Sequence, residues 1–177
     1  MNGLAKNIVA IIFFLLINFS NTIAQRKTVD SLLKLLSTAK NDTARIITYG
    51  DLVEAYKNVN LDSGVYYAQQ QILISKKLND PYWSAVALNQ YGYALLFAGN
   101  YPDALAALYQ ALQQSEHNAD TSGIATSYLQ LGFVYRNSDE YRKALYYFNK
   151  YKLITDYYND DYMRMTFYTR LAELMNS

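Results

Sequence analysis

The sequence predicts an all-α fold, a solenoid of antiparallel helix pairs. The main observation is a period. Apolar, small and acidic residues recur every 40 positions over 80–177, and a fixed period of about 20–50 residues is typical of stacked supersecondary units. The second observation is composition, because two prolines and seven glycines in 177 residues disfavour a turn-rich β fold. The positions that keep the step of 40 are Asp80, Asp120 and Asp160; Leu88, Tyr128 and Tyr168; Tyr91, Leu131 and Leu171; Gly92, Gly132 and Ala172; and Gly64, Ala104 and Ala144.

Residues 1–24 are expected to form a secretory signal peptide. Lys6 precedes the ten apolar residues 8–17, and small residues lead to Ala24, after which we place cleavage. The alternative is an uncleaved anchor, although the apolar run is short of the about 20 residues that a membrane helix needs. We therefore expect an exported chain, periplasmic or in the cell envelope. It would touch the membrane only through an uncleaved signal or a segment beyond Ser177.

Residues 25–41 are expected to hold a capping helix and a linker, and the repeat array to occupy 42–177. A valine and four leucines indicate the capping helix: Val29, Leu32, Leu33, Leu35 and Leu36. The first copy, 42–80, is degenerate, because its turn near Asn60 is one residue shorter than the later turns. Its two helices are indicated by Tyr49, Leu52 and Tyr56, and by Gly64, Ala68 and Ile72. Residues 161–177 are expected to hold the first helix of a fourth copy.

The second and third copies, 81–120 and 121–160, have the clearest helical pattern. Residues at i, i+3, i+4 and i+7 predict the first helix of each copy: Leu88, Tyr91, Gly92 and Leu95, and then Tyr128, Leu131, Gly132 and Tyr135. Asp80 before Pro81 is typical of an N-cap followed by a proline in the first helical position, and Asp120 and Asp160 are also expected to be helix caps. Gly99 is expected to end the helix that Pro81 begins.

Small residues are expected to bring the two helices of each pair together. Gly92 lies twelve residues before Ala104, and Gly132 lies twelve residues before Ala144. Glycine inside a helix costs about 1 kcal/mol relative to alanine, so its use here needs a steric reason. We expect these four residues to pack the repeats, and a large side chain at Gly132 to break its helix pair.

These patterns resemble the tetratricopeptide repeat (TPR). That family combines a bulky residue, Leu-Gly and Tyr with Ala, an aromatic or Leu, and Ala at set spacings. The clearest copies here read Leu88, Tyr91, Gly92, Leu95, Ala104, Leu108 and Ala111, and Tyr128, Leu131, Gly132, Tyr135, Ala144, Phe148 and Tyr151. Two departures, the 40-residue period and the replacement of a terminal proline by Glu116 and Asp156, also occur in a longer-period variety of the family.

The resemblance implies a superhelix whose first helices line a concave surface that binds a protein or peptide. Aromatic rings there would give contact area and polar groups would give orientation. The candidate binding residues are Asn89, Tyr93, Leu96, Phe97, Leu129, Phe133, Arg136 and Asn137, with Ile47, Glu54, Lys57, Val86 and Thr126 beside them. The alternative is that Phe97 and Phe133 only fill gaps between repeats. The carboxylate clamp of one TPR subclass is absent, because Glu54, Tyr93 and Phe133 occupy its positions.

Composition disfavours other classes of site. Lys and Arg number 16 against 15 Asp and Glu, and nucleic-acid binding rests largely on phosphate neutralisation, so no nucleic-acid partner is expected. The chain has no cysteine, and its single histidine, His117, falls in an expected inter-helix turn. We therefore expect no metal and no cofactor. The groove acids Glu54 and Glu173 lie three repeats apart, so this segment is not expected to be an enzyme.

The chain also resembles the exported sensor part of bacterial two-component histidine kinases. The resemblance lies in the N-terminal signal, the opening Val29–Leu33 and the junction Leu78–Asp80. Similar arrays precede membrane-bound helix-turn-helix regulators. Any kinase or other effector would lie after Ser177. The alternatives are a free-standing periplasmic scaffold for envelope complexes and, third, a divergent helical-array enzyme whose active site lies in missing repeats.

Overall fold

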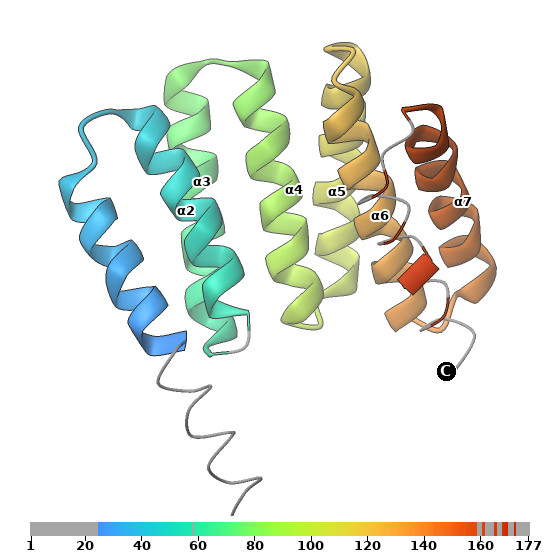
Figure 1. Cartoon of the computed structure of the whole chain (residues 1–177), viewed down its shortest axis with the longest axis horizontal. Coiled ribbons are helices and arrows are strands. Elements are labelled where there is room, and N and C mark those ends of the chain that lie inside the picture. Colours follow the sequence, from blue (N-terminus) through green and yellow to red (C-terminus); the bar gives the residue numbers. More distant parts are fainter. Residues whose placement is uncertain are drawn as a thin grey trace, which may run out of the picture.

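The computed structural model describes residues 25–57 and 59–158, with residues 161, 165, 168, 169 and 172 (Figure 1). All regular structure in this part of the chain is α-helical. A helix over 25–38 comes first. The helices that follow are α2 (Asp42–Tyr56), α3 (Leu61–Leu78), α4 (Pro81–Phe97), α5 (Tyr101–His117), α6 (Thr121–Asn137) and α7 (Tyr141–Tyr157). The predicted all-α solenoid is confirmed. The expected signal peptide, Asp160, Leu171, Glu173 and Met175 lie outside the described residues.

The helices stand side by side in a row that follows the chain (Figure 1). Each helix from α2 to α7 packs against the next one. The first helices of successive pairs also contact one another, α2 with α4 and α4 with α6. No comparable backbone contact joins α3 to α5 or α5 to α7 in the described residues. The first helices therefore form one continuous layer, while the second helices are spaced more widely in the other.

Side-chain caps begin five of the six labelled helices. The N-cap residues whose side chains accept a hydrogen bond from a backbone N–H of the first turn are Asn41, Asn60, Asp80, Asn100 and Asp120. The predicted caps Asp80 and Asp120 are thus confirmed. Glu140 precedes α7 without such a bond, which leaves that helix start less satisfied than the others.

The four turns between α3 and α7 share one backbone feature every 20 residues. Asn79, Gly99, Ala119 and Asp139 have φ angles of 51°, 76°, 53° and 59°. A residue in this left-handed region commonly ends a helix, because it turns the chain away from the axis. Gly99 ends α4 in this way, as predicted. His117 does not lie in a turn, however, because α5 continues through it to its C-cap Asn118.

The core lies between the two layers of helices. Its completely or almost completely buried side chains come from both helices of each pair: Ile46, Leu52, Val53, Ala68, Ala85, Ala87, Ala104, Leu108, Leu131, Ala144 and Phe148. Burying a valine, leucine, isoleucine or phenylalanine side chain contributes about 1.5–3 kcal/mol. Because the pairs contact mainly their neighbours, stability accumulates along the row instead of around one central core.

The two predicted packing glycines each face a large side chain of the partner helix. A Cβ added to Gly92 would lie 2.5 Å from Cγ of Leu108 and 3.3 Å from the backbone oxygen of Ala104. A Cβ added to Gly132 would lie 2.5 Å from Cδ1 of Phe148. The glycines thus make room mainly for the residue 16 positions later, in addition to the alanine 12 positions later. Carbon atoms cannot approach so closely, so any side chain at these positions forces the pair apart.

In the first pair, the larger residue lies on the first helix and the smaller one on the second, the reverse of the later pairs. Its first helix carries Val53 where the later pairs carry glycine, and its second helix carries Ala68 where they carry Leu108 and Phe148. Val53 and Ala68 are both buried in one apolar cluster. A larger residue on one helix is therefore matched by a smaller one on the other.

Candidate functional site

A cavity of about 230 Å³ opens along the layer of first helices, where α4 and α6 approach the end of α2. The residues that line it are Lys57, Tyr93, Leu96, Phe97, Phe133, Arg136 and Asn137. Six of them are among the eight candidate binding residues from the sequence. They meet here because α4 and α6 are adjacent (Figure 1) and the 40-residue step gives equivalent positions the same direction.

Aromatic rings form the wall of this cavity. Tyr93 and Phe97, one helical turn apart, meet edge to face with ring centroids 4.8 Å apart. Phe133 meets the buried Phe148 edge to face at 5.5 Å, and the guanidinium of Arg136 lies 5.4 Å from the Phe133 ring centroid. Phe133 therefore serves core packing as well as the cavity. Phe97 keeps 41% of its surface exposed, so its ring is available for contact with a partner.

A polar network joins the cavity to α2. The Tyr93 hydroxyl donates a hydrogen bond of 2.6 Å to Oε2 of Glu54, and Nζ of Lys57 donates one of 3.2 Å to the Tyr93 hydroxyl. Lys57 also forms an ion pair with Glu54. Its Nζ lies 5.9 Å from the ring centroids of both Tyr93 and Phe97, within reach of a cation–π attraction. The network fixes a positive charge beside the aromatic wall.

The network shifts two pKa values upward. Burial, followed by the hydrogen bond to Glu54, raises the pKa of Tyr93 to about 12. Burial by itself would lower the pKa of Lys57, but its bonds to Glu54 and Tyr93 outweigh that effect and the pKa is raised. At neutral pH the phenol thus stays protonated and donates, while the ammonium stays charged.

Two candidate binding residues do not face this cavity. Asn89 is 5% exposed, and its Oδ1 accepts a hydrogen bond of 2.9 Å from the Ser127 hydroxyl. That bond ties α4 to α6, so Asn89 contacts the next repeat, and its role in orienting a ligand stays a prediction. Leu129 is half-buried and packs against the core. Leu96 lines the cavity but is only 5% exposed, which places it at the base.

A smaller cavity continues along the same layer towards the starts of α4 and α6. Its volume is about 180 Å³, and Val86, Asn89 and Thr126 are among the residues that line it. All three were expected to face the groove. Oε1 of Gln130, another residue of this lining, is buried without a hydrogen-bond partner. Most of the residues predicted to face a groove therefore line two separate cavities along α4 and α6.

The sequence pattern did not reveal the contact between Tyr93 and Glu54. The two residues are 39 positions apart, one less than the period, because the turn of the first pair is one residue shorter. The spacing already makes Glu54 the equivalent of Tyr93 and places Lys57 on the same helix face, but equivalence between copies does not show that their side chains meet. Within the described residues, no cluster of His, Asp and Glu has the arrangement of a metal site.

The family match agrees with this architecture. Residues 20–176 match the family model described as the SusR N-terminal TPR domain. The chain belongs to this family. The expected TPR resemblance is thereby confirmed, and the SusR-type TPR domain is a protein–protein interaction module, as TPR domains generally are. A comparison with curated proteins found no match. Among the described helices of the domain, none combines the length and the apolar character needed to cross a membrane.

Proposed function

We propose that the SusR-type TPR domain binds an extended segment of a partner protein along α2, α4 and α6. An apolar or aromatic side chain of that segment enters the cavity beside Phe97 and Phe133. The observation that carries the proposal is the combination of an exposed ring with a preformed cavity of about 230 Å³. Buried aromatic anchors provide much of the binding energy in protein interfaces.

The charges around the cavity support a partner that carries a carboxylate next to the apolar side chain. Lys57 and Arg136 both line the cavity. Glu54 balances Lys57 in part, and the bond to Tyr93 keeps that carboxylate turned towards α4. Complementary charges of this kind add orientation and specificity more than affinity. A segment with an acidic residue beside an aromatic one fits both parts of the surface.

The proposal is tested by selecting peptides from a random phage-displayed library on the purified domain. A selected peptide, made synthetically, should bind the Phe97→Ala and Arg136→Ala variants at least about tenfold more weakly than the parent. Tyr146→Ala is the matched control, because this ring on α7 is also exposed and lies outside the cavity. Equal losses in all three variants, or none in the first two, would contradict the assignment of the groove.

We further propose that the domain acts outside the cytoplasm as the N-terminal sensor of a longer signal-transduction protein. The support is the signal-like segment 1–24 and the sensor-like sequences at Val29–Leu33 and Leu78–Asp80. Residues 1–40 fused to alkaline phosphatase should give periplasmic activity, while the same fusion starting at residue 25 should not. The coding sequence after Ser177 should continue into a membrane span of about 20 apolar residues and an effector. A stop codon shortly after Ser177 would favour the scaffold alternative.

A further inference from the structure

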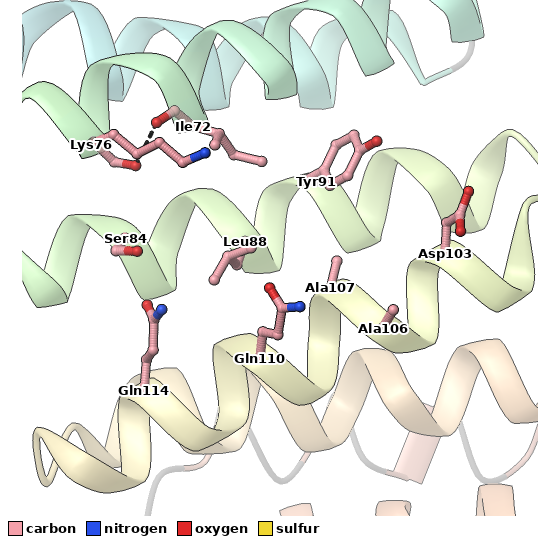
Figure 2. A pocket seen from close by; sticks show the side chains of 11 residues that line it. Ile72, Lys76, Ser84, Leu88, Tyr91, Asp103, Ala106, Ala107, Gln110 and Gln114 are labelled. Atoms are coloured by element: carbon pink, nitrogen blue, oxygen red, sulfur yellow. Dashed lines mark hydrogen bonds between the residues drawn. The ribbon is translucent and has the colours of Figure 1, made fainter.

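A larger cavity lies on the other side of the middle helix pair. Figure 2 shows α4 running between α3 and α5, with side chains from all three helices around a space of about 520 Å³. Leu88 and Tyr91 come from α4, Ala107 and Gln114 from α5, and Ile72 from α3. None of its lining residues belongs to the cavity beside Phe97. Its volume is within the range of ligand sites in proteins, about 300–1,000 Å³.

The corresponding place in the third pair is occupied by a tyrosine. Tyr147 of α7 stacks on Tyr135 with an interplanar angle of 3° and centroids 5.5 Å apart, and it lies 6.1 Å from the ring of Tyr128. Its hydroxyl is 2.7 Å from that of Tyr109 on α5. The phenol ring of Tyr147 thus fills the space between α5 and α7, and its hydroxyl contacts the hydroxyl of Tyr109.

The first pair has the same arrangement. Tyr67 of α3 stacks on Tyr56 at 5.5 Å and on Tyr49 at 5.9 Å. The neighbour Tyr66 meets Tyr67 edge to face at 5.2 Å, as Tyr146 meets Tyr147 at 5.1 Å. Two of the three pairs therefore place a phenol at one position of the second helix, on two tyrosines of the first.

The middle pair replaces all of these rings. The positions equivalent to Tyr128, Tyr135 and the Tyr146–Tyr147 dipeptide are Leu88, Leu95, Ala106 and Ala107. Leu88, Ala106 and Ala107 line the large cavity. Tyrosine is replaced by leucine on the first helix and by alanine on the second, so the volume of the missing rings accounts for the cavity.

The cavity offers polar chemistry that suits a phenol. Gln114, which extends from α5 towards α4 in Figure 2, has a buried Oε1 with no hydrogen-bond partner. A buried acceptor without a donor is costly, and a ligand hydroxyl would satisfy it. Leu88 and Ala107 offer apolar contact for the flat faces of a ring. The cavity therefore combines apolar contact surface with a lining that is also polar, including Lys76 and Asp103, and it holds an unsatisfied acceptor.

We propose that this cavity binds a phenolic ring supplied from outside the domain. The ring packs on Leu88 and Ala107, in the space left by the missing tyrosines, and its hydroxyl donates to Oε1 of Gln114. Two sources share this chemistry, the tyrosine side chain of a partner protein and a free phenolic compound. The site is separate from the groove beside Phe97, so it does not depend on the function proposed for that groove.

The test is titration of the ¹⁵N-labelled domain with p-cresol, the isolated tyrosine side chain, followed by NMR. The amide signals of Leu88, Ala106 and Ala107 should shift saturably. Toluene, which lacks the hydroxyl, should bind about fivefold more weakly because it leaves Gln114 unpaired. A five-residue peptide with a central tyrosine separates the sources. Binding at least as tight as that of p-cresol indicates a partner side chain, and binding at least tenfold weaker indicates a free phenol.

Two variants decide whether the binding is at this cavity. Ala107→Tyr should fill the space with the domain's own ring and abolish the p-cresol shifts, while Gln113→Tyr, on an exposed position of α5 outside the cavity, should leave them unchanged. Gln114→Leu, which keeps the cavity, should remove the preference for p-cresol over toluene. The proposal is overturned by p-cresol shifts that persist in Ala107→Tyr, by equal binding of toluene to the parent, or by no saturable shifts.

Discussion

The middle and third helix pairs have the same backbone design but different interiors. Their helices α4, α5, α6 and α7 are each 17 residues long. In the third pair, Tyr147 packs between Tyr135 and Tyr128. In the middle pair, leucines and alanines at these positions leave a cavity of about 520 Å³. The comparison shows that the 40-residue period specifies the arrangement of the helices. Side-chain volume at a few equivalent positions decides whether a cavity lies between them.

Packing within the pairs follows the same rule. Gly132 makes room for Phe148 in the third pair, Gly92 makes room for Leu108 in the middle pair, and the first pair exchanges the volumes of its two helices. Interiors are close-packed, so a gain in volume on one helix needs a loss on the other. Where that balance is not kept, as at Ala107, a cavity results.

The largest expected effect comes from breaking the balance in the third pair. Phe148→Ala should lower the free energy of unfolding by about 3–5 kcal/mol, because it empties a fully buried site. Adding Gly132→Val should recover part of the loss, since the double variant reproduces the Val53–Ala68 arrangement of the first pair. Gly132→Val alone should destabilise by about 1–3 kcal/mol through overpacking. Urea unfolding of the parent, the two single variants and the double variant measures the coupling energy between positions 132 and 148. Strictly additive changes in the free energy of unfolding would contradict this coupling.

A second prediction turns the third pair into a copy of the middle one. Tyr147→Ala removes the ring between Tyr128 and Tyr135 and the hydroxyl that contacts Tyr109. We expect a loss of about 2–4 kcal/mol in thermal or urea unfolding. The neighbouring Tyr146→Ala, which removes a ring that is 55% exposed, should cost less than about 1 kcal/mol. Similar losses in the two variants would mean that the stack of Tyr147 on Tyr128 and Tyr135 adds little to stability.

A third prediction concerns alkaline pH. Burial, followed by the hydrogen bond to Tyr109, raises the pKa values of Tyr135 and Tyr147, and Tyr93 has a pKa of about 12. A pKa raised in the folded state stabilises the fold below the ordinary tyrosine value near 10, and this contribution is lost as pH rises through the folded value.

The unfolding free energy should therefore fall between about pH 10 and 12. Tyr93→Phe should reduce this fall in the unfolding free energy by about 1 kcal/mol. The effect is smaller than the whole pKa shift of Tyr93 would give, because solvent partly screens the group. Tyr82→Phe, which changes an exposed tyrosine for which no such network exists among the described contacts, serves as control. A pH profile unchanged in Tyr93→Phe would contradict the role of the Glu54–Tyr93 bond.

The smallest expected effect tests the backbone that both pairs share. Ala119, after α5, has a left-handed φ of 53°, and Gly99 has a left-handed φ of 76° after α4. Alanine is strained there by about 1 kcal/mol, whereas glycine is not. Ala119→Gly should raise the unfolding free energy by up to about 1 kcal/mol in a urea titration, while Ala98→Gly, at a right-handed C-cap, should not. A loss of stability in Ala119→Gly would show that the turn depends on the alanine side chain.

The sequence predicted the features that repeat and missed those that depend on a combination of residues. The helix pairs, the caps Asp80 and Asp120 and the clustering of Tyr93, Phe97 and Phe133 follow from periodicity, because equivalent positions point the same way. The burial of Asn89 was not predictable from its place on the first-helix face, since it depends on Ser127 of the next repeat.

The large cavity was missed for the same reason. Ala106 and Ala107 are ordinary helix residues by propensity, and nothing in their own copy marks a void. Their significance emerges only when they are compared with Tyr66–Tyr67 and Tyr146–Tyr147, together with the leucines that face them. The volume of this cavity depends on side chains from three helices. Helical periodicity predicts the direction in which each side chain points, but it does not predict how much space the side chains leave between them.

The most direct test of this account is a crystal structure of the Ala107→Tyr variant. If the open middle pair results only from missing rings, the introduced phenol should lie between α3 and α5, packed on Leu88 and Leu95 as Tyr147 packs on Tyr128 and Tyr135. Its hydroxyl should point towards α3, as that of Tyr147 points to Tyr109 on α5. The helices should keep their positions. A ring that points into solvent above a cavity of unchanged volume, or a displaced α5, would contradict the claim that side-chain volume alone distinguishes the two pairs.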